Sequence, residues 1–356
     1  MFGKIVGGLA AILVSAAACL AAPSAMAQNA YITNGGSNTV SVINTATNAV
    51  VATVLVGATP TGVAVSQNGS RIYVTNFNDA SVSVIDASTN AVVATIPVGT
   101  TPLGVAVSPN GARVYVANIS DHTVSVINTA TNLVVATVAV GGNPYGVVVS
   151  PDGARVYVAS TGSSSVSVID TATNTVVATP TVGVGPRGVA LSPNGARLYV
   201  GTASNSVTVI DTATNAFVSN VPVGITAFGV AVSPNGARAY VSNYNSATVS
   251  VIDTATNTVV ATVGVGSNPY GVSITPNGAR AYVVNFGDNT VSVIDTATNT
   301  VVATLPVGGS PYGFGQFITP AAPAPVPTLT EWAMILLGLM LAGGAVAMIQ
   351  RRRVTV

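Results

Sequence analysis

One tyrosine-centred repeat determines most of what this chain can fold into. It recurs at spacings of 42, 42, 42, 42, 41 and 42 residues, at Tyr31, Tyr73, Tyr115, Tyr157, Tyr199, Tyr240 and Tyr282. Seven units therefore fill residues 28–320 of the 356-residue chain. A fixed period of this length is typical of repeat proteins in which each unit buries its apolar faces against its neighbours.

Each unit contains four short runs that are rich in Val, Ile and Tyr. In the unit at residues 62–102 the runs are 62–66, 71–76, 81–86 and 91–98. Apolar and polar residues largely alternate in these runs, which is the period of a half-buried strand, and turn residues such as Asn68-Gly69 separate them. Four strands in a unit of this length predict one antiparallel blade of a β-propeller.

The order of strands at the two ends of the repeats predicts a closed ring. The first unit begins at Tyr31 with a second strand, and residues 313–318 match a first strand. Pairing the two ends would complete the first blade and remove the unpaired edges of an open array. We therefore expect an all-β, seven-bladed propeller of four-stranded antiparallel blades, whose closing blade is made of residues 31–56 and 313–318.

The second strand of the unit carries a recurring four-residue motif. It reads Tyr31-Ile-Thr-Asn34, Tyr73-Val-Thr-Asn76, Tyr115-Val-Ala-Asn118, Tyr240-Val-Ser-Asn243 and Tyr282-Val-Val-Asn285, whereas Ser160 and Thr202 replace the Asn in two units. This motif and the repeated Asp/Asn-Thr-Ala-Thr-Asn turns resemble the YVTN β-propeller repeat. The resemblance implies a surface or periplasmic binding propeller.

Residues 1–27 have the features of a secretory signal peptide. Lys4 precedes an apolar run at 5–20, and Ala25-Met26-Ala27 forms a cleavage site. Two alternatives are a membrane anchor, for which the run is short, and a lipoprotein attached through Cys19. Cleavage after Ala27 would leave a chain without cysteine, so its stability would depend on packing alone.

The C-terminal part predicts a membrane tether. A Pro-rich spacer at 321–332 precedes an apolar segment at 333–349, and residues 350–356 form a basic tail. These 17 apolar residues, with Trp332 at the interface, just suffice to span a bilayer. The Arg cluster that follows would place the C-terminus in the cytoplasm.

This tail also carries more than an anchor needs. Its characteristic residues are Pro327, Thr328, Leu329, Glu331, Trp332, Arg351, Arg352 and Arg353. They resemble the IPTL-CTERM sorting tail, with Val326 where the family has Ile and Ala333 where it often has Gly. The resemblance implies a Gram-negative bacterium, an exosortase-like membrane enzyme as partner, and delivery to the cell surface or extracellular matrix. The alternative is a permanent inner-membrane anchor with a periplasmic binding protein.

The composition excludes several classes of function. Charged residues make up only 6% of the chain, but its hydrophobic content of 49% is too high for a disordered protein. Residues 28–320 contain seven Arg and nine Asp, a formal charge of −2, which does not support a nucleic-acid-binding surface. Six Arg recur at one position and would face, across the hairpin, Asp86, Asn128, Asp170, Asp211, Asp253 and Asp295. Such cross-strand pairs stabilise sheets.

The repeats offer few residues for catalysis. Residues 28–320 contain no Cys, Lys or Glu and only one His, His122, beside Asp121. No cluster has the ligand spacing of a zinc site. We expect a monomeric non-enzyme without metal or cofactor. The alternative is a periplasmic hydrolase or lyase that uses His122.

One position of the repeat varies strongly. The residue before the first-strand Gly is Thr61, Leu103, Tyr145, Arg187, Phe228, Tyr270 or Tyr312. These residues should ring one mouth of the propeller, with Phe77, Tyr244 and Phe286 farther out, near Asp79, Asp121 and Asp288. We predict that Tyr145, Arg187, Phe228, Tyr270 and Tyr312 bind a carbohydrate or protein ligand. The alternative is that the rings only plug the axis.

Overall fold

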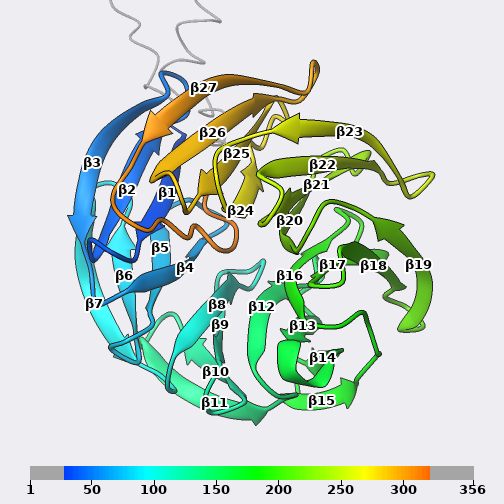
Figure 1. Cartoon of the computed structure of the whole chain (residues 1–356). Helices are drawn as coiled ribbons and strands as arrows, with labels where there is room; N and C mark the ends of the chain where they lie inside the picture. Colours follow the sequence, from blue (N-terminus) through cyan, green and yellow to red (C-terminus); the bar gives the residue numbers. More distant parts are fainter. Residues whose placement is uncertain (1–27, 321–356) are drawn as a thin grey trace, which may run out of the picture. The chain divides into compact units, whose positions relative to one another are not determined.

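The computed structural model describes residues 28–320, which form seven antiparallel sheets arranged as blades around one axis (Figure 1). We number the blades 1 to 7 from the N-terminal end. Six sheets have four strands in sequential order, and the sheet of blade 1 has three. In this part of the chain the only helical turn is the 3-10 helix η1 (Thr161–Ser163). The predicted all-β, seven-bladed propeller is confirmed.

The strands follow the predicted runs. The first, innermost strands are β4 (Pro60–Val65), β8 (Pro102–Val107), β12 (Pro144–Val149), β16 (Pro186–Leu191), β20 (Ala227–Val232) and β24 (Pro269–Ile274). The second strands are β1 (Asn29–Asn34), β5 (Arg71–Asn76), β9 (Arg113–Asn118), β13 (Arg155–Ser160), β17 (Arg197–Thr202), β21 (Arg238–Asn243) and β25 (Arg280–Asn285).

The two remaining strands of each blade lie farther from the axis. The third strands are β2 (Thr39–Asn44), β6 (Ser81–Asp86), β10 (Thr123–Asn128), β14 (Ser165–Asp170), β18 (Ser206–Asp211), β22 (Thr248–Asp253) and β26 (Thr290–Asp295). The fourth strands are β3 (Ala49–Leu55), β7 (Ala91–Pro97), β11 (Leu133–Ala139), β15 (Thr175–Ala178), β19 (Ala216–Pro222), β23 (Thr258–Gly264) and β27 (Thr300–Pro306).

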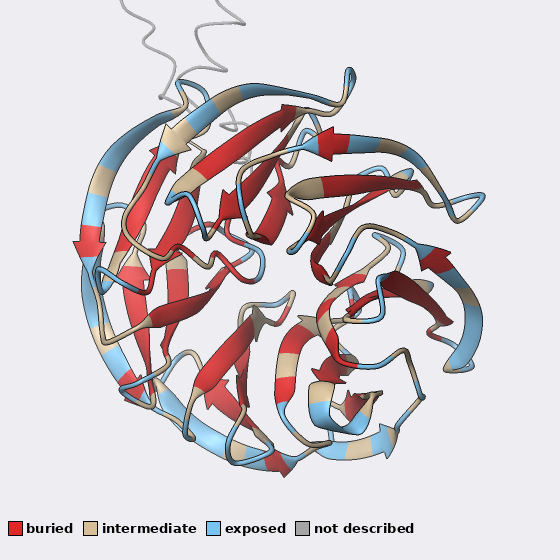
Figure 2. Cartoon of the chain, in the orientation of Figure 1, coloured by how far each residue is buried: buried red, intermediate tan, exposed pale blue. Residues whose placement is uncertain are grey.

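Burial falls from the middle of each blade to its outer edge. The second and third strands are buried almost throughout, because both of their faces pack against neighbouring blades, whereas the fourth strands are mostly exposed (Figure 2). The repeated Tyr side chains are between 0% and 3% exposed. The core is therefore a set of apolar layers between blades, as the repeat predicts.

The motif residues Tyr and Asn connect strands and blades. The Tyr282 hydroxyl donates a 2.7 Å hydrogen bond to Oδ1 of Asn48 in the turn of the next blade. The motif Asn works within its own hairpin, where Asn34 donates through Nδ2 to the side chains of Thr39 and Ser41 at 3.1 and 2.9 Å. Asn76, Asn118, Asn243 and Asn285 make the same two contacts.

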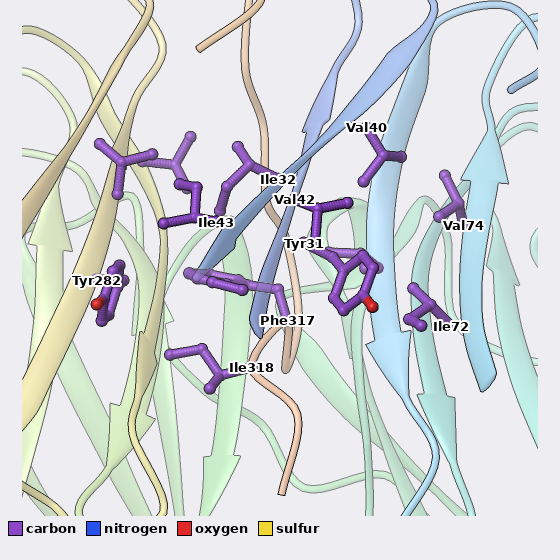
Figure 3. Close-up of a cluster of buried hydrophobic side chains, with 14 of the residues drawn as sticks. Tyr31, Ile32, Val40, Val42, Ile43, Ile72, Val74, Tyr282, Phe317 and Ile318 are labelled. Carbon is purple, nitrogen blue, oxygen red and sulfur yellow. The ribbon is translucent and has the colours of Figure 1, made fainter. Parts of the chain in front are cut away.

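The two ends of the described region, residues 28–320, close the ring, as predicted. The Tyr31 amide donates to the Phe317 carbonyl at 2.8 Å, and on the other side the Val63 amide donates to the Phe314 carbonyl at 2.9 Å. The segment after β27 therefore lies between β1 and β4 (Figure 1). Phe317 is fully buried there, with Tyr31 and Tyr282 on either side (Figure 3).

The boundaries of this closing segment differ from the predicted residues 313–318. Pairing with β1 begins at Pro311, which bridges to Asn34, and is resumed at Ile318, which bridges to Ala30. In β24 only four residues separate the equivalent positions Pro269 and Ile274, whereas six separate Pro311 and Ile318. The two additional residues prevent a continuous ladder with β1.

The predicted charge pairing is confirmed in its register. All six Arg residues lie opposite the expected Asp or Asn residues. Ion pairs form between Arg71 and Asp86, Arg197 and Asp211, Arg238 and Asp253, and Arg280 and Asp295. Arg155 and Asp170 face each other without an ion pair among the described residues.

Several predictions concern segments beyond the described residues. The signal peptide with Cys19, the spacer, the transmembrane helix at 333–349 and the basic tail all lie there. Between residues 28 and 320 there is no helix of the length and hydropathy that crossing a membrane requires.

Candidate binding site at the propeller mouth

The variable position of the repeat brings its side chains together at one mouth of the propeller. Leu103, Phe228 and Tyr270 form a buried cluster with Phe314, and each is 4–6% exposed. The partly buried side chains around this floor are Ile119, Tyr145, Tyr244, Phe286 and Tyr312. Thr61, the seventh variable residue, is buried and bonds to the Thr75 hydroxyl instead.

Phe314 completes the floor and was not among the predicted site residues. Its ring centroid lies 5.4 Å from that of Tyr145 and 5.8 Å from that of Tyr270, both nearly perpendicular. Phe228 and Tyr270 approach to 4.0 Å. The rings thus fill the axis with aromatic contacts. Phe314 belongs to the two-residue insertion in the closing segment, which is the signal that could have identified it.

Two hydroxyl groups meet within this cluster. The hydroxyls of Tyr145 in blade 4 and Tyr270 in blade 7 are 2.5 Å apart. Burial is the largest cause that raises the pKa of Tyr270 well above its usual value, and the neighbouring Tyr145 raises this pKa further. Both groups are therefore neutral hydrogen-bonding groups at physiological pH.

Arg187 adds one cation to the mouth. The centre of its guanidinium lies 4.5 Å from the ring centroid of Phe228, which is a cation–π geometry. Among the described residues it forms no ion pair and no hydrogen bond, and its side chain is half-buried. The edge of the guanidinium, with its N–H groups, therefore remains available.

Aromatic residues from the outer loops form part of the rim. Phe286 lies 5.2 Å from Tyr312, and Tyr244 lies 5.5 Å from Phe228, measured between ring centroids. Gly35 makes room for Tyr312, because a Cβ atom there would lie 2.6 Å from the tyrosine ring. Phe77, the third predicted outer aromatic residue, does not pack against this cluster.

The three Asp residues predicted near the mouth stabilise its loops by accepting hydrogen bonds from backbone amides. Asp79, Asp121 and Asp288 accept hydrogen bonds from the backbone amides of Ala58, Thr100 and Ser267 at 2.5, 2.7 and 2.6 Å. The Thr100 side chain and amide lower the pKa of Asp121. Ser37, Ser163 and Ser246 accept equivalent bonds in three other blades. These contacts stabilise the loops that carry the mouth residues.

The described residues show no arrangement typical of metal binding. No group of three or more His, Cys, Asp or Glu side chains between residues 28 and 320 could hold a metal ion. His122 lies in an exposed loop, where Nδ1 accepts a bond from the Asn143 amide. The mouth is thus an aromatic platform with one cation and several hydroxyl groups.

Two parts of the chain match known families. Residues 106–214, within blades 3 to 5, match the YNCE-like beta-propeller, and residues 324–353 match the IPTL-CTERM motif. The second match contains all the predicted sorting residues. An IPTL-CTERM motif indicates an exported, surface-sorted protein that an exosortase-type enzyme processes.

Solved structures support the same fold. Hydrazine synthase from Kuenenia stuttgartiensis is 26% identical, with a TM-score of 0.64, over 70% of this chain and 87% of that chain. A functionally unknown protein from Desulfotomaculum acetoxidans is 15% identical, with a TM-score of 0.70, over 81% of this chain and 99% of that chain. No curated protein matches. The chain is a seven-bladed β-propeller with a region similar to YNCE-like propellers and a C-terminal IPTL-CTERM motif, which is compatible with the YVTN resemblance.

Proposed function

We propose that this protein is a surface-displayed binding module without catalytic activity, and that its ligand, a carbohydrate or a protein, binds at the mouth. The observation that carries the proposal is the concentration of variable aromatic side chains, with one unpaired Arg, at this mouth. A residue that served only to pack equivalent blades would be expected to look alike in every blade. At this one repeat position, three successive blades instead carry Tyr145, Arg187 and Phe228, which differ in polarity and charge.

The opposite face provides the comparison. Its turns between first and second strands read Ser-Pro-Asn-Gly or close variants, and their glycines share φ values of 71° to 73°. In these turns the Ser side chain accepts the amide of the Arg three residues after the Asn, as in Ser108 and Arg113. Uniform turns on one face and variable aromatic residues on the other favour a function at the mouth.

Display at the surface is consistent with the tail. A plain anchor needs an apolar helix and a positive cluster, so the Pro-Thr-Leu motif at residues 327–329 is surplus to anchoring. We propose that the tail retains the exported protein in the inner membrane until cleavage near this motif releases the propeller to the surface or matrix.

Binding is tested with the full-length protein on a glycan array and in a cell-adhesion assay. A Tyr145→Ala/Tyr312→Ala variant, which removes two half-buried rings of the rim, should lose about tenfold in affinity, the effect of removing stacking rings. Arg113→Ala on the opposite face is the matched control. Undiminished binding by the rim variant would reject the mouth as the site.

Sorting is tested by intact-mass measurement of the native protein from membrane and surface fractions. We expect a surface form that ends near Pro327, and retention of the tail in a Pro327→Ala variant. A surface form with the mass of residues 28–356 would instead support a permanent anchor.

A further inference from the structure

We propose that the mouth recognises an acidic polysaccharide, with the Arg187 guanidinium binding the carboxylate of a uronic acid residue while neighbouring rings contact the sugar. This inference rests on the proposed binding function and specifies its ligand. It follows from the charge distribution at the mouth, the geometry of Arg187 and the shape of the platform.

Arg187 differs from every other cation of the propeller. The other six Arg residues begin second strands on the opposite face, where four form ion pairs with Asp. Arg187 is the second residue of β16 and lies at the mouth in blade 5. It has no carboxylate partner among residues 28–320. It is the one Arg of the described propeller that lies at the mouth, and no ion pair neutralises its charge there.

The negative charges at the mouth lie in other blades. Asp79, Asp121 and Asp288 belong to the loops of blades 2, 3 and 7, and the mouth loops of blades 4, 5 and 6 contain no carboxylate. Tyr145, Arg187 and Phe228 come from these three blades. An acidic ligand over them would meet a cation and would be separated from the carboxylates.

The stacking of Arg187 orients its hydrogen-bonding groups. Phe228 is 5% exposed and covers one face of the guanidinium at 4.5 Å. A guanidinium held by its face presents its N–H groups at the edge, in the planar fork that matches a carboxylate. Partial burial strengthens such a charged pair relative to one in bulk water.

The tyrosine pair supplies a neutral donor beside this cation. When two hydroxyls are hydrogen-bonded to each other, only one of them donates its O–H in that bond. The O–H of the other remains free to donate to a third group. Tyr270 is 6% exposed, whereas Tyr145 is half-buried, so Tyr145 is the more accessible side chain of the pair. A sugar hydroxyl or carboxylate oxygen can accept from it.

The form of the mouth favours a sugar over a peptide. Phe314 and the other floor rings contact one another across the axis. The side chains of Tyr145, Tyr244 and Tyr312 are only half-buried and leave part of their surface accessible. Flat aromatic surfaces with polar edges suit the apolar faces and hydroxyls of sugar rings.

The test is calorimetric titration of the full-length protein in detergent. The probes are oligomers of galacturonic and mannuronic acid, their neutral methyl esters, and a tetraglutamate peptide. An acidic oligomer should bind at least about tenfold more tightly than its ester, which is the expected effect of a charged hydrogen bond. Arg187→Gln should abolish this difference, and Arg187→Lys should retain only part of it.

Controls separate this inference from the proposed function. Arg113→Gln removes the same charge from the opposite face and should change neither affinity, and equal melting temperatures would show that the variants are folded. Equal affinity for acid and ester, or acid binding unaffected by Arg187→Gln, would overturn the inference while leaving a binding mouth. Binding of tetraglutamate alone would identify a peptide site and overturn it as well. If glycan-array, adhesion and calorimetric assays all show no binding, the proposed function fails with it.

Discussion

The backbone amide of Asn143 donates a 3.0 Å hydrogen bond to Nδ1 of His122. His122 has a positive φ of 56°, a conformation that favours Asn and Gly. In three other blades a backbone amide 21 residues later donates the same bond to the Oδ1 atom of an Asn, namely Asn38, Asn205 or Asn289. The imidazole of His122 therefore accepts the loop hydrogen bond that the amide oxygen of an Asn accepts in those blades.

This equivalence predicts that His122→Asn leaves the stability unchanged within about 0.5 kcal/mol, because Asn supplies the acceptor. His122→Ala should cost about 1 kcal/mol through the lost hydrogen bond. Ala80 and Ala247 occupy the equivalent position with similar φ, so backbone strain adds little. Chemical denaturation measures both values. A hydrolase or lyase dependent on this imidazole would instead lose its turnover in His122→Asn.

Ring closure predicts a large effect at Phe317. Phe317→Ala should cost about 3–5 kcal/mol, because the side chain is fully buried between the first and last blades. Phe217→Ala is the matched control: this ring is 63% exposed on β19, and its removal should cost less than about 0.5 kcal/mol. Thermal denaturation of both variants measures the difference. Equal melting temperatures would show that the C-terminal segment does not hold the ring together.

The approach of neighbouring blades at the axis predicts an effect at Gly104. A Cβ atom there would lie 2.0 Å from the carbonyl oxygen of Tyr145, so two backbones would have to separate. Gly104→Ala should cost about 1–3 kcal/mol or more. Gly264→Ala on β23 meets no atom within 4 Å and should be neutral or slightly stabilising. Denaturant titration of the two variants tests this, and a neutral Gly104→Ala would contradict the close packing of first strands.

The repeat made the fold predictable, because strand period, turn residues and spacing agree in every unit. Blade number, strand order and the opposition of Arg71 and Asp86 follow from that agreement and are confirmed. The limits of the closing segment differ from the prediction, because its two additional residues have no counterpart in the other units.

The sequence predicted most of the residues that line the candidate site, but not how their side chains pack. A position that varies among equivalent blades identifies Tyr145, Arg187 and Tyr270, and the ring geometry brings them together. How far the rings fill the axis depends on rotamers and on Phe314, which a repeat pattern does not contain. The role of Asp121 as a loop acceptor depends on a backbone amide 21 residues earlier, which is likewise invisible in the sequence.

The titratable groups predict a stability plateau between about pH 5 and 9. Hydrogen bonds in the turns after the third strands lower the pKa of five Asp residues: from the Ser88 hydroxyl for Asp86, and from backbone amides for Asp170, Asp211, Asp253 and Asp295. Their stabilisation is present above the unfolded pKa near 4 and is lost as the pH falls through the lower folded values.

At the alkaline end the sign reverses. Burial raises the pKa of Tyr282 to about 12. Its contribution is complete below the unfolded pKa near 10 and is lost as the pH rises through the folded value. Melting temperatures measured from pH 2 to 12 should therefore fall below about pH 4 and above about pH 10. Asp170→Asn, which mimics Asn128 in blade 3, should reduce the acid-side slope, and an unchanged slope would contradict the assignment.

The hydroxyl pair at the mouth predicts a coupling between blades on opposite sides of the axis. Tyr145→Phe leaves the buried Tyr270 hydroxyl without its 2.5 Å partner, and Tyr270→Phe removes the other half of the bond. Each single variant should cost about 1–2 kcal/mol, because it loses a hydrogen bond and leaves a polar group unpaired. The double variant leaves no unpaired hydroxyl in this pair and should cost less than the sum by about 1 kcal/mol. Denaturation of all four proteins measures this coupling. Additive costs would mean that the two hydroxyls do not interact in solution, and the Tyr145 donor would then no longer be oriented by Tyr270.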